Sequence, residues 1–373
     1  MTDAFENNYT LGVTDADSQC SGPTSYESNI VITVFVAFLL ILGVVGNVIT
    51  LCVIMKNKNL RTNFNRFLMS LCASDLVSAC ICSPLWLYRR TWGFSEWNLG
   101  PAMCKFYWVS DFATDFTTSL HILSFCLLRF FAISFPFTAP TTRFKSNKFR
   151  LYIASLWFLS LLLAAPHAYF MDVRQNEGTG SDKWPSCSID KDKKHQYHIY
   201  SVVVYSLFFY VPAVLIIILS FITTRNLLKM TQSAALSRVN DAARASRIRR
   251  RNKAACLQLR LICASFTFGY VLVAAYLIWT SANEPDPTDC RLMTVDYWFG
   301  VTSYLLLRIS ECVNPVMYNL GCSEMRASTF DFVKHSVFRR ASRVARAHSQ
   351  QRERIFTIFH SRSGAPPEDY IEE

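Results

Sequence analysis

The stretch IVITVFVAFLLILGVVGNVITLCVI, residues 30–54, decides the fold class of this chain. It contains no Lys, Arg, Asp or Glu. A helix needs about 20 residues to cross a bilayer, and this stretch is longer than that. Because backbone N–H and C=O groups must pair internally in lipid, such a run folds as a helix. It is also too long for the apolar core of a signal peptide, so we expect it to be a first membrane span.

Further apolar runs of membrane length follow along the chain. The composition agrees, since 51% of the residues are hydrophobic and only 17% are charged, against about 25% in an average soluble domain. A large soluble helical protein would not contain so many separate runs of this length. We therefore predict an all-α membrane protein with a bundle of seven transmembrane helices. The runs lie near residues 29–55, 64–88, 102–134, 150–171, 198–224, 256–281 and 293–319.

Basic residues are concentrated in the loops that follow spans one, three and five. The densest group is Arg244–Lys253, whereas the segment before Ser28 contains acidic residues but no Lys or Arg. The positive-inside rule places these loops in the cytoplasm, the N-terminus outside and the C-terminus inside. Arg89 and Arg90, after span two, are an exception. The net charge of +11 therefore indicates membrane topology rather than nucleic-acid binding.

This topology divides the chain into four parts. We expect an extracellular N-terminal segment at 1–28, the seven-helix bundle at 29–319, an amphipathic eighth-helix region at 320–341 and a disordered cytoplasmic tail at 342–373. Asn8, in the sequon Asn8-Tyr9-Thr10, is the expected glycosylation site of the outer segment.

The eighth helix is expected over about residues 323–338. Met325 and Phe330 contribute to its apolar face, and Arg326 and Lys334 can reach lipid headgroups. A helix with this pattern lies on the membrane surface instead of crossing it.

Four of the thirteen cysteines fall in outer segments or at the outer ends of spans: Cys20, Cys104, Cys187 and Cys290. The outside of a cell is oxidising, so these thiols can pair. We predict a Cys104–Cys187 disulfide, which would pin the long second outer loop over the bundle. Cys20 and Cys290 are the remaining pair and would tie the N-terminus to the third outer loop.

Each span also carries a short motif, and together the motifs form an ordered set. By this set the chain resembles the rhodopsin-like family, family A, of G-protein-coupled receptors over nearly its whole length. The motifs are Gly46-Asn47-Val48, Leu71 with Asp75, Pro84, Trp97 before Cys104, Arg129, Trp157 with Pro166, Phe209 with Pro212, and Asn314-Pro315-Val316-Met317-Tyr318.

The resemblance implies a multi-pass plasma-membrane receptor, not an enzyme. Its expected partners are an extracellular ligand, a heterotrimeric G protein, arrestin and the lipid bilayer, with no nucleic acid. We find no pattern of catalytic or metal-ligating residues in the sequence. We expect no cofactor other than an allosteric sodium ion near Asp75.

Asp75 is the residue around which that ion site is expected. An ionisable side chain inside a span is costly and needs a polar partner. The resemblance implies a hydrated, sodium-sized site formed by Asp75 with Asn47, Thr118, Glu311 and Asn314.

The resemblance also implies a G-protein switch formed by Arg129, Pro315 and Tyr318. Proline removes an N–H donor and weakens the helix around it, so Pro315 is the expected hinge that lets Tyr318 move. The sequence departs from the family near this switch. Leu128 stands where an Asp usually precedes Arg129, and Tyr270 replaces the usual Trp of span six.

The expected ligand-binding residues are Asp111, Asp115, Tyr205, Tyr270 and Arg308. Asp111 and Asp115 are one helical turn apart on one face of span three. In amine receptors and in some peptide receptors, the position of Asp111 binds a ligand ammonium. The charged outer loop after span four and Arg308 in span seven favour a neuropeptide over a biogenic amine.

Arg308 is expected to pair with Asp111, because an unpaired guanidinium in mid-span is expensive. Three alternatives remain open. Arg308 could reach the outer water near Glu284, Asp115 could share its charge, or Glu311 could compete for it instead of joining Asp75.

Three other functions also remain open at this stage. The chain could be a biogenic-amine receptor, or a constitutively active or otherwise atypical receptor-like protein, as the changes at Leu128 and Tyr270 indicate. A transporter or channel that uses the buried acids fits least well, because the sequence shows no inverted repeat.

Overall fold

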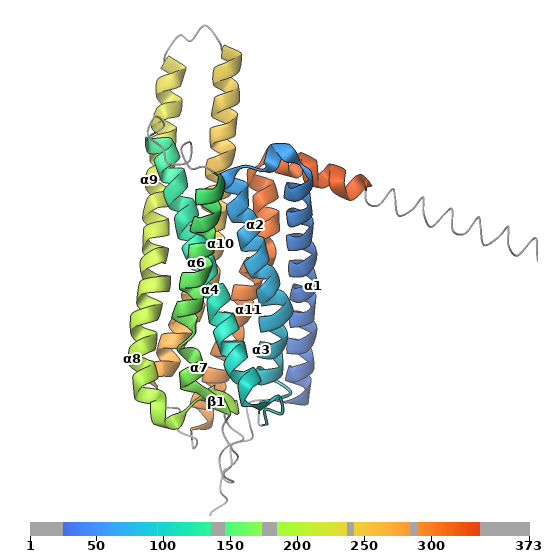
Figure 1. The fold of residues 1–373 in the computed structure, drawn as a ribbon, viewed down its shortest axis with the longest axis vertical. Coiled ribbons are helices and arrows are strands. Elements are labelled where there is room, and N and C mark those ends of the chain that lie inside the picture. Colours follow the sequence, from blue (N-terminus) through green and yellow to red (C-terminus); the bar gives the residue numbers. More distant parts are fainter. Residues whose placement is uncertain are drawn as a thin grey trace, which may run out of the picture.

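The computed structural model describes residues 25–94, 96–135, 146–173, 185–236, 242–283 and 289–335. These residues form a bundle of long helices that run side by side (Figure 1). Six helices, among them α1 (Tyr26–Lys56), are long and apolar enough to cross a membrane. A further long helix, α11 (Cys290–Gly321), has Arg308 and Glu311 within its central part and packs against α1. The protein is therefore the all-α seven-helix membrane bundle that the sequence predicts.

The other spans are built from one or more helical segments each. Span two is α2 (Asn63–Val77) and α3 (Ser83–Arg90), and span five is α8 (Lys194–Tyr205) and α9 (Val211–Leu236). The remaining segments are η1 (Lys58–Leu60), α4 (Gly100–Ser134), α6 (Ser146–Ala164), α7 (His167–Phe170), η4 (Lys191–Lys193) and α10 (Ala242–Ala282). Several helices, most clearly α9 and α10, extend beyond the apolar runs that predicted them.

Spans two and five each contain one π-helical turn that the sequence did not predict. The turns are η2 (Ser78–Cys82) between α2 and α3, and η5 (Ser206–Tyr210) between α8 and α9. Such turns interrupt the regular hydrogen-bond ladder and are frequent at functional sites. In η2, the backbone carbonyl of Ser78 accepts a hydrogen bond of 3.1 Å from the Ser83 hydroxyl.

The surface and the centre of the bundle differ in polarity. Apolar side chains of α1 and α6 are exposed, as for Val31 at 68% and Phe158 at 69%, which suits a surface that faces lipid. The centre contains buried polar groups, among them Asn47 on α1 and Asp75 on α2. This distribution is expected where lipid surrounds the protein and polar groups must find partners inside it.

Helices α10 and α11 approach each other closely at Gly269. A Cβ atom at this position would lie 2.5 Å from Ser310 Oγ and 3.3 Å from the Leu307 Cα of α11. The absence of a side chain is therefore required by packing. The Ser265 hydroxyl joins the same two helices by donating to the Ser310 carbonyl at 3.0 Å.

Helix α11 continues without a break through Pro315. Residues 323–335 then form a further helix, which runs away from the bundle axis in Figure 1. Its Ser328 hydroxyl accepts a hydrogen bond of 2.8 Å from Asn57, and its Phe332 ring lies 4.6 Å from Lys56 Nζ. These contacts attach it to the end of α1, and its place on a membrane surface stays a prediction.

Several expected features lie outside the described residues. These are the sequon at Asn8, the thiol of Cys20, the carboxylate of Glu284, most of the segment 1–28 and the whole tail 342–373.

Candidate functional site

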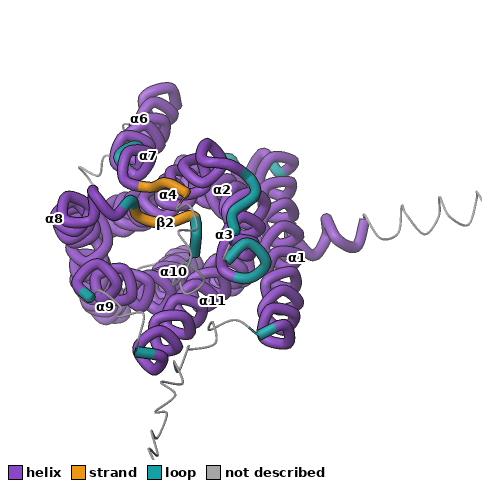
Figure 2. The backbone as a smooth tube through the Cα atoms, turned by 90° about the horizontal axis from the view of Figure 1, so that it is seen from below, coloured by secondary structure: helices purple, strands orange, loops and turns teal. Residues whose placement is uncertain are grey.

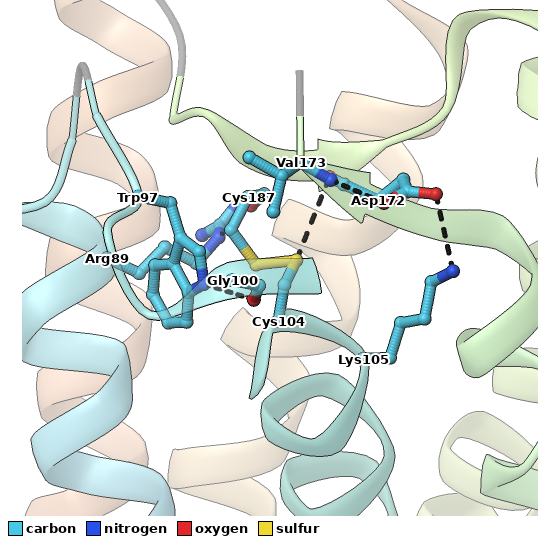
Figure 3. Close-up of a disulfide and its surroundings, with 8 residues drawn as sticks. All are labelled: Arg89, Trp97, Gly100, Cys104, Lys105, Asp172, Val173 and Cys187. Carbon is cyan, nitrogen blue, oxygen red and sulfur yellow. Dashed lines mark hydrogen bonds and ion pairs between the residues drawn. A yellow bond between two sulfur atoms is a disulfide. The ribbon is translucent and has the colours of Figure 1, made fainter. Parts of the chain in front are cut away.

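A short hairpin covers one end of the bundle, which we call the disulfide end. Strand β1 (Met171–Val173) pairs antiparallel with β2 (Cys187–Ile189), and the hairpin lies beside α4 (Figure 2). Cys187 forms a disulfide with Cys104 near the start of α4, with Cα atoms 5.6 Å apart (Figure 3). The predicted Cys104–Cys187 bond is confirmed.

Two interactions fix the start of α4 beneath this hairpin. The Trp97 indole donates to the Gly100 carbonyl at 2.9 Å (Figure 3). Gly100 has φ +78°, a left-handed conformation that favours glycine. Lys105 of α4 and Asp172 of β1 form an ion pair of 3.3 Å, which ties the start of α4 to the hairpin.

Arg89 and Arg90 are buried at the disulfide end, although the topology argument treated them only as an exception. Arg89 Nε donates to the Cys187 carbonyl at 2.6 Å. Arg90 donates to the carbonyls of Asp296 and Tyr297 on α11, at 3.1 and 3.0 Å. The two arginines therefore join span two to the hairpin and to α11. Sequence reasoning missed this role, because a basic pair after a span gives no sign of its partners.

Arg308, on α11, makes the predicted ion pair with Asp111 on α4, with Nη2 at 3.2 Å from Oδ1. Its other terminal nitrogen, Nη1, lies 2.6 Å from Glu311 Oε2. The guanidinium also stacks over the Tyr304 ring at 4.4 Å. All three charged residues are buried, so each charge is compensated by its ion-pair partners and not by water.

Glu311 pairs with Arg308 and also lies within electrostatic range of Asp75. Its Oε2 accepts a hydrogen bond of 3.0 Å from Ser78 in the π turn η2. The hydroxyl of Thr118, also expected at the ion site, lies 3.4 Å from the Ser74 hydroxyl on α2. Glu311 therefore belongs to the Arg308 network and remains near the expected ion site.

Asp115 lies one turn along α4 from Asp111, within electrostatic range of the Arg308 network. It is 3% exposed, and its Oδ1 has no hydrogen-bond partner among the residues that the structure describes. Three carboxylates therefore lie near the single guanidinium of Arg308, those of Asp111, Asp115 and Glu311. When all are ionised, the centre of the bundle has more negative than positive charge.

The two tyrosines of the expected ligand set meet through Phe209, whose ring centroid lies 5.8 Å from that of Tyr205 and 5.9 Å from that of Tyr270. The Tyr205 hydroxyl bonds to Tyr197 at 2.8 Å and to His167 at 3.2 Å, and its ring stacks against Phe112. Tyr205 thus belongs to an aromatic cluster between α4, α7 and α8. Tyr270 of α10 stacks on Phe266 at 4.6 Å.

Asp75 has the polar partner that its burial requires. Its Oδ2 accepts a hydrogen bond of 3.2 Å from Asn314 Nδ2. The Oδ1 atom of Asp75 and the buried Oδ1 of Asn47 have no hydrogen-bond partner within the described part of the chain. Carboxylate and amide oxygens are the ligands that hard cations prefer, so the chemistry of these two atoms suits a sodium ion.

The three residues expected to form the G-protein switch lie toward the end of the bundle opposite the disulfide. The Arg129 guanidinium stacks over the Phe64 ring at 3.6 Å, so α4 contacts the start of α2 there. Tyr318 is fully buried. Pro315 packs against α1, since a Cβ atom at Gly46 would lie 3.0 Å from its Cγ.

Most of the bundle matches a single family of known proteins. Residues 46–318 match the family model described as 7 transmembrane receptor (rhodopsin family). The chain is 26% identical over 309 residues to growth hormone secretagogue receptor type 1 of Sus scrofa, covering 80% of each chain. It is 27% identical over 305 residues to the Homo sapiens receptor, covering 78% of this chain and 77% of the other. Neurotensin receptor type 1 of Rattus norvegicus is 24% identical over 337 residues, covering 83% and 79%.

Proposed function

Because this chain belongs to the rhodopsin family of seven-transmembrane receptors, we propose that it is a plasma-membrane receptor that binds an extracellular peptide and activates heterotrimeric G proteins. The similar receptors are peptide receptors, which supports a peptide ligand here. The disulfide end faces outward in this proposal, because disulfides persist in an oxidising compartment. The basic loops then face the cytoplasm, where arrestin is a further expected partner.

The observation that carries the ligand proposal is the excess of carboxylates around Arg308. Asp111 and Glu311 already share that guanidinium, whereas Asp115 is buried with one oxygen unpartnered among the described residues. A buried carboxylate is costly unless a cation compensates it. We therefore infer that the peptide presents a basic group, an N-terminal ammonium, Lys or Arg, to Asp115.

Binding of that group would act on the network that joins α4 to α11. A new cation beside Asp115 would weaken the attraction between Arg308 and its two carboxylates. A ligand shifts a conformational equilibrium when it binds one state better than the other. The Arg308 network would then be the bistable element, with α11 transmitting its change toward Tyr318 and the G-protein side.

The ligand proposal predicts a selective effect of Asp115→Asn. Peptides found by screening a library of basic peptides in cells should lose about 100-fold or more in potency, because a buried charge pair is lost. The exposed Asp331→Asn, in the helix that follows α11 and away from the disulfide end, is the matched control and should keep its potency. Surface expression is measured for both variants. Equal potency on wild type and Asp115→Asn would rule out this contact.

A sodium ion at Asp75 is a second part of the proposal. Sodium chloride should raise the melting temperature of the purified receptor relative to choline chloride, because a ligand that binds only the folded state stabilises it. In Asp75→Asn the amide cannot supply the negative charge, so the difference between the two salts should disappear. An unchanged salt difference in Asp75→Asn would place the ion elsewhere.

One observation favours a receptor with high activity in the absence of ligand. Leu128, an apolar residue, precedes Arg129 on α4. A leucine side chain cannot form an ion pair with the neighbouring guanidinium, so position 128 supplies no ionic restraint on the switch. G-protein signalling is measured in cells that express the receptor, without added peptide. Basal signalling equal to that of untransfected cells would exclude high ligand-free activity.

A further inference from the structure

Two free cysteines from different helices lie in contact inside the bundle. The Sγ atoms of Cys126 on α4 and Cys263 on α10 are 3.4 Å apart. The two residues are separated by 137 positions in the sequence, so only the packing of α10 against α4 brings them together. Both thiols are free and buried, with Cys126 0% and Cys263 6% exposed. The pair is separate from the ligand network and from the ion site described above.

The geometry of the pair suits a covalent bond between the two sulfur atoms. Bonded sulfurs lie about 2.0 Å apart, so those of Cys126 and Cys263 need to approach by about 1.4 Å. Small rotations about the two χ1 angles move the sulfur atoms this far without a shift of either helix. The contrast is buried Cys82, whose sulfur faces the Thr114 hydroxyl at 4.0 Å and has no such reaction with it.

The surroundings of the pair determine how it reacts. Cys126 and Cys263 belong to an apolar core that also contains Phe125, Ile262 and Phe266. Apolar surroundings disfavour the thiolate, which is the form that an oxidant attacks, so the first oxidation is slow. The second step needs no diffusion, because atoms about 3–3.5 Å apart are already in position to react. A sulfur that is oxidised here therefore meets its neighbour before anything else.

We propose that Cys126 and Cys263 form a peroxide-sensitive pair that is oxidised to a disulfide between α4 and α10. In the first step, the sulfur of Cys263, the more exposed of the two, attacks hydrogen peroxide. An S–O bond forms, the O–O bond breaks, and the thiol proton leaves with the hydroxide as water. The Cys126 sulfur then attacks the sulfenic sulfur, so that the S–S bond forms, the S–O bond breaks and a second water leaves. Two thiols and one hydrogen peroxide thus give one disulfide and two waters.

The disulfide would restrain three helices. Cys126 lies one turn before Arg129 on α4. On α10, Ser265 lies two residues after Cys263 and donates a hydrogen bond of 3.0 Å to the Ser310 carbonyl of α11. The bond would therefore join α4 to α10 at the level where α10 is already held to α11. A state in which α4 and α10 separate at this level becomes inaccessible to the oxidised chain.

The oxidation is tested on the purified full chain by mass spectrometry. The receptor is treated with hydrogen peroxide, its remaining thiols are blocked with N-ethylmaleimide, and the monomer is digested without a reductant. We expect a linked pair of peptides that contains Cys126 and Cys263 and is two hydrogen atoms lighter than the two free peptides together. Oxygen or maleimide adducts at both cysteines, with no linked pair, would overturn the proposal.

Single variants show whether the linked pair comes from this contact. Cys126→Ser and Cys263→Ser should each abolish it, because one sulfur is missing. Cys80→Ser, which removes an exposed free thiol from η2, is the control and should give the linked pair in wild-type yield. An equal loss of the linked pair in Cys80→Ser would mean that it arises by exchange among thiols and not from direct oxidation of this contact.

Thermal denaturation measures whether the bond restrains the helices. Peroxide-treated wild type should melt several degrees above the untreated receptor, because the new bond closes a long loop in the unfolded chain. Cys126→Ser should gain nothing from the same treatment. A linked receptor that melts no higher than the untreated one would show that α4 and α10 are not held together by the bond. Neither the linked peptides nor the melting temperature depends on whether the chain binds a peptide or activates a G protein.

Discussion

Charge reversal at either end of the Asp111–Arg308 ion pair should strongly reduce the amount of receptor at the cell surface. Removing one partner of a buried ion pair costs about 3–5 kcal/mol, because the other charge stays buried without compensation. Arg308→Asp should be the worse single variant, since it places a third carboxylate beside Asp111 and Glu311. Asp111→Arg should be milder, because Glu311 still faces a cation.

The double variant, Asp111→Arg with Arg308→Asp, should restore surface expression only in part. The exchanged charges can still pair across the two helices, as the 3.2 Å contact between Arg308 Nη2 and Asp111 Oδ1 indicates. Glu311, however, would then lie beside an aspartate on its own helix instead of a guanidinium. Adding Glu311→Gln to the double variant removes that repulsion and should improve expression further.

The measurement is surface expression and basal signalling of the single, double and triple variants. The matched control is the same swap at Lys105 and Asp172, an exposed pair of 3.3 Å that should contribute at most about 1 kcal/mol. A double variant no better than Arg308→Asp alone would show that the two residues are not energetically coupled.

Loss of the Cys104–Cys187 disulfide should have the second largest effect. The bond joins residues 83 apart in sequence, for which the chain-entropy model gives about 4–5 kcal/mol. Cys187→Ser also frees the hairpin whose Cys187 carbonyl accepts the hydrogen bond of buried Arg89. We expect a melting temperature lower by several degrees, and less receptor at the surface.

Thermal denaturation followed by size-exclusion chromatography measures this change. Cys80→Ser, at an exposed free cysteine of the π turn η2, is the control and should melt close to wild type. Wild-type stability of Cys187→Ser would show that packing and the Arg89 contact, not the covalent bond, hold the hairpin.

The fold was predictable from sequence because its signal is strong and local. Six of the spans are long and apolar, and the cost of an unpaired backbone in lipid leaves only a helix. The pairing of Arg308 with Asp111 was predictable for the same reason, since a buried cation requires a counter-ion. The π turns η2 and η5 could not be predicted from the sequence, because a change in hydrogen bonding over a single turn does not alter the pattern of apolar residues.

Which partner a buried charge selects was only partly predictable. Glu311 lies one turn from both Arg308 and Asn314 on α11, and spacing alone could not decide between them. In the structure Glu311 pairs with Arg308 and also accepts a hydrogen bond of 3.0 Å from Ser78 in the π turn η2. The ion pair of 3.6 Å between Arg90 and Asp296 could not be predicted either, because the two residues are distant in sequence and meet only where α3 lies beside α11.

The π turn η2 has a consequence for which side chains of span two face the bundle. A π turn takes up about one residue more than an α turn, so the residues after it are rotated by about 100° relative to an uninterrupted helix. Beyond Cys82, counting helical positions from Asp75 in steps of 3.6 residues therefore misplaces Trp86, Arg89 and Arg90 around the helix. All three of these side chains are buried in the structure.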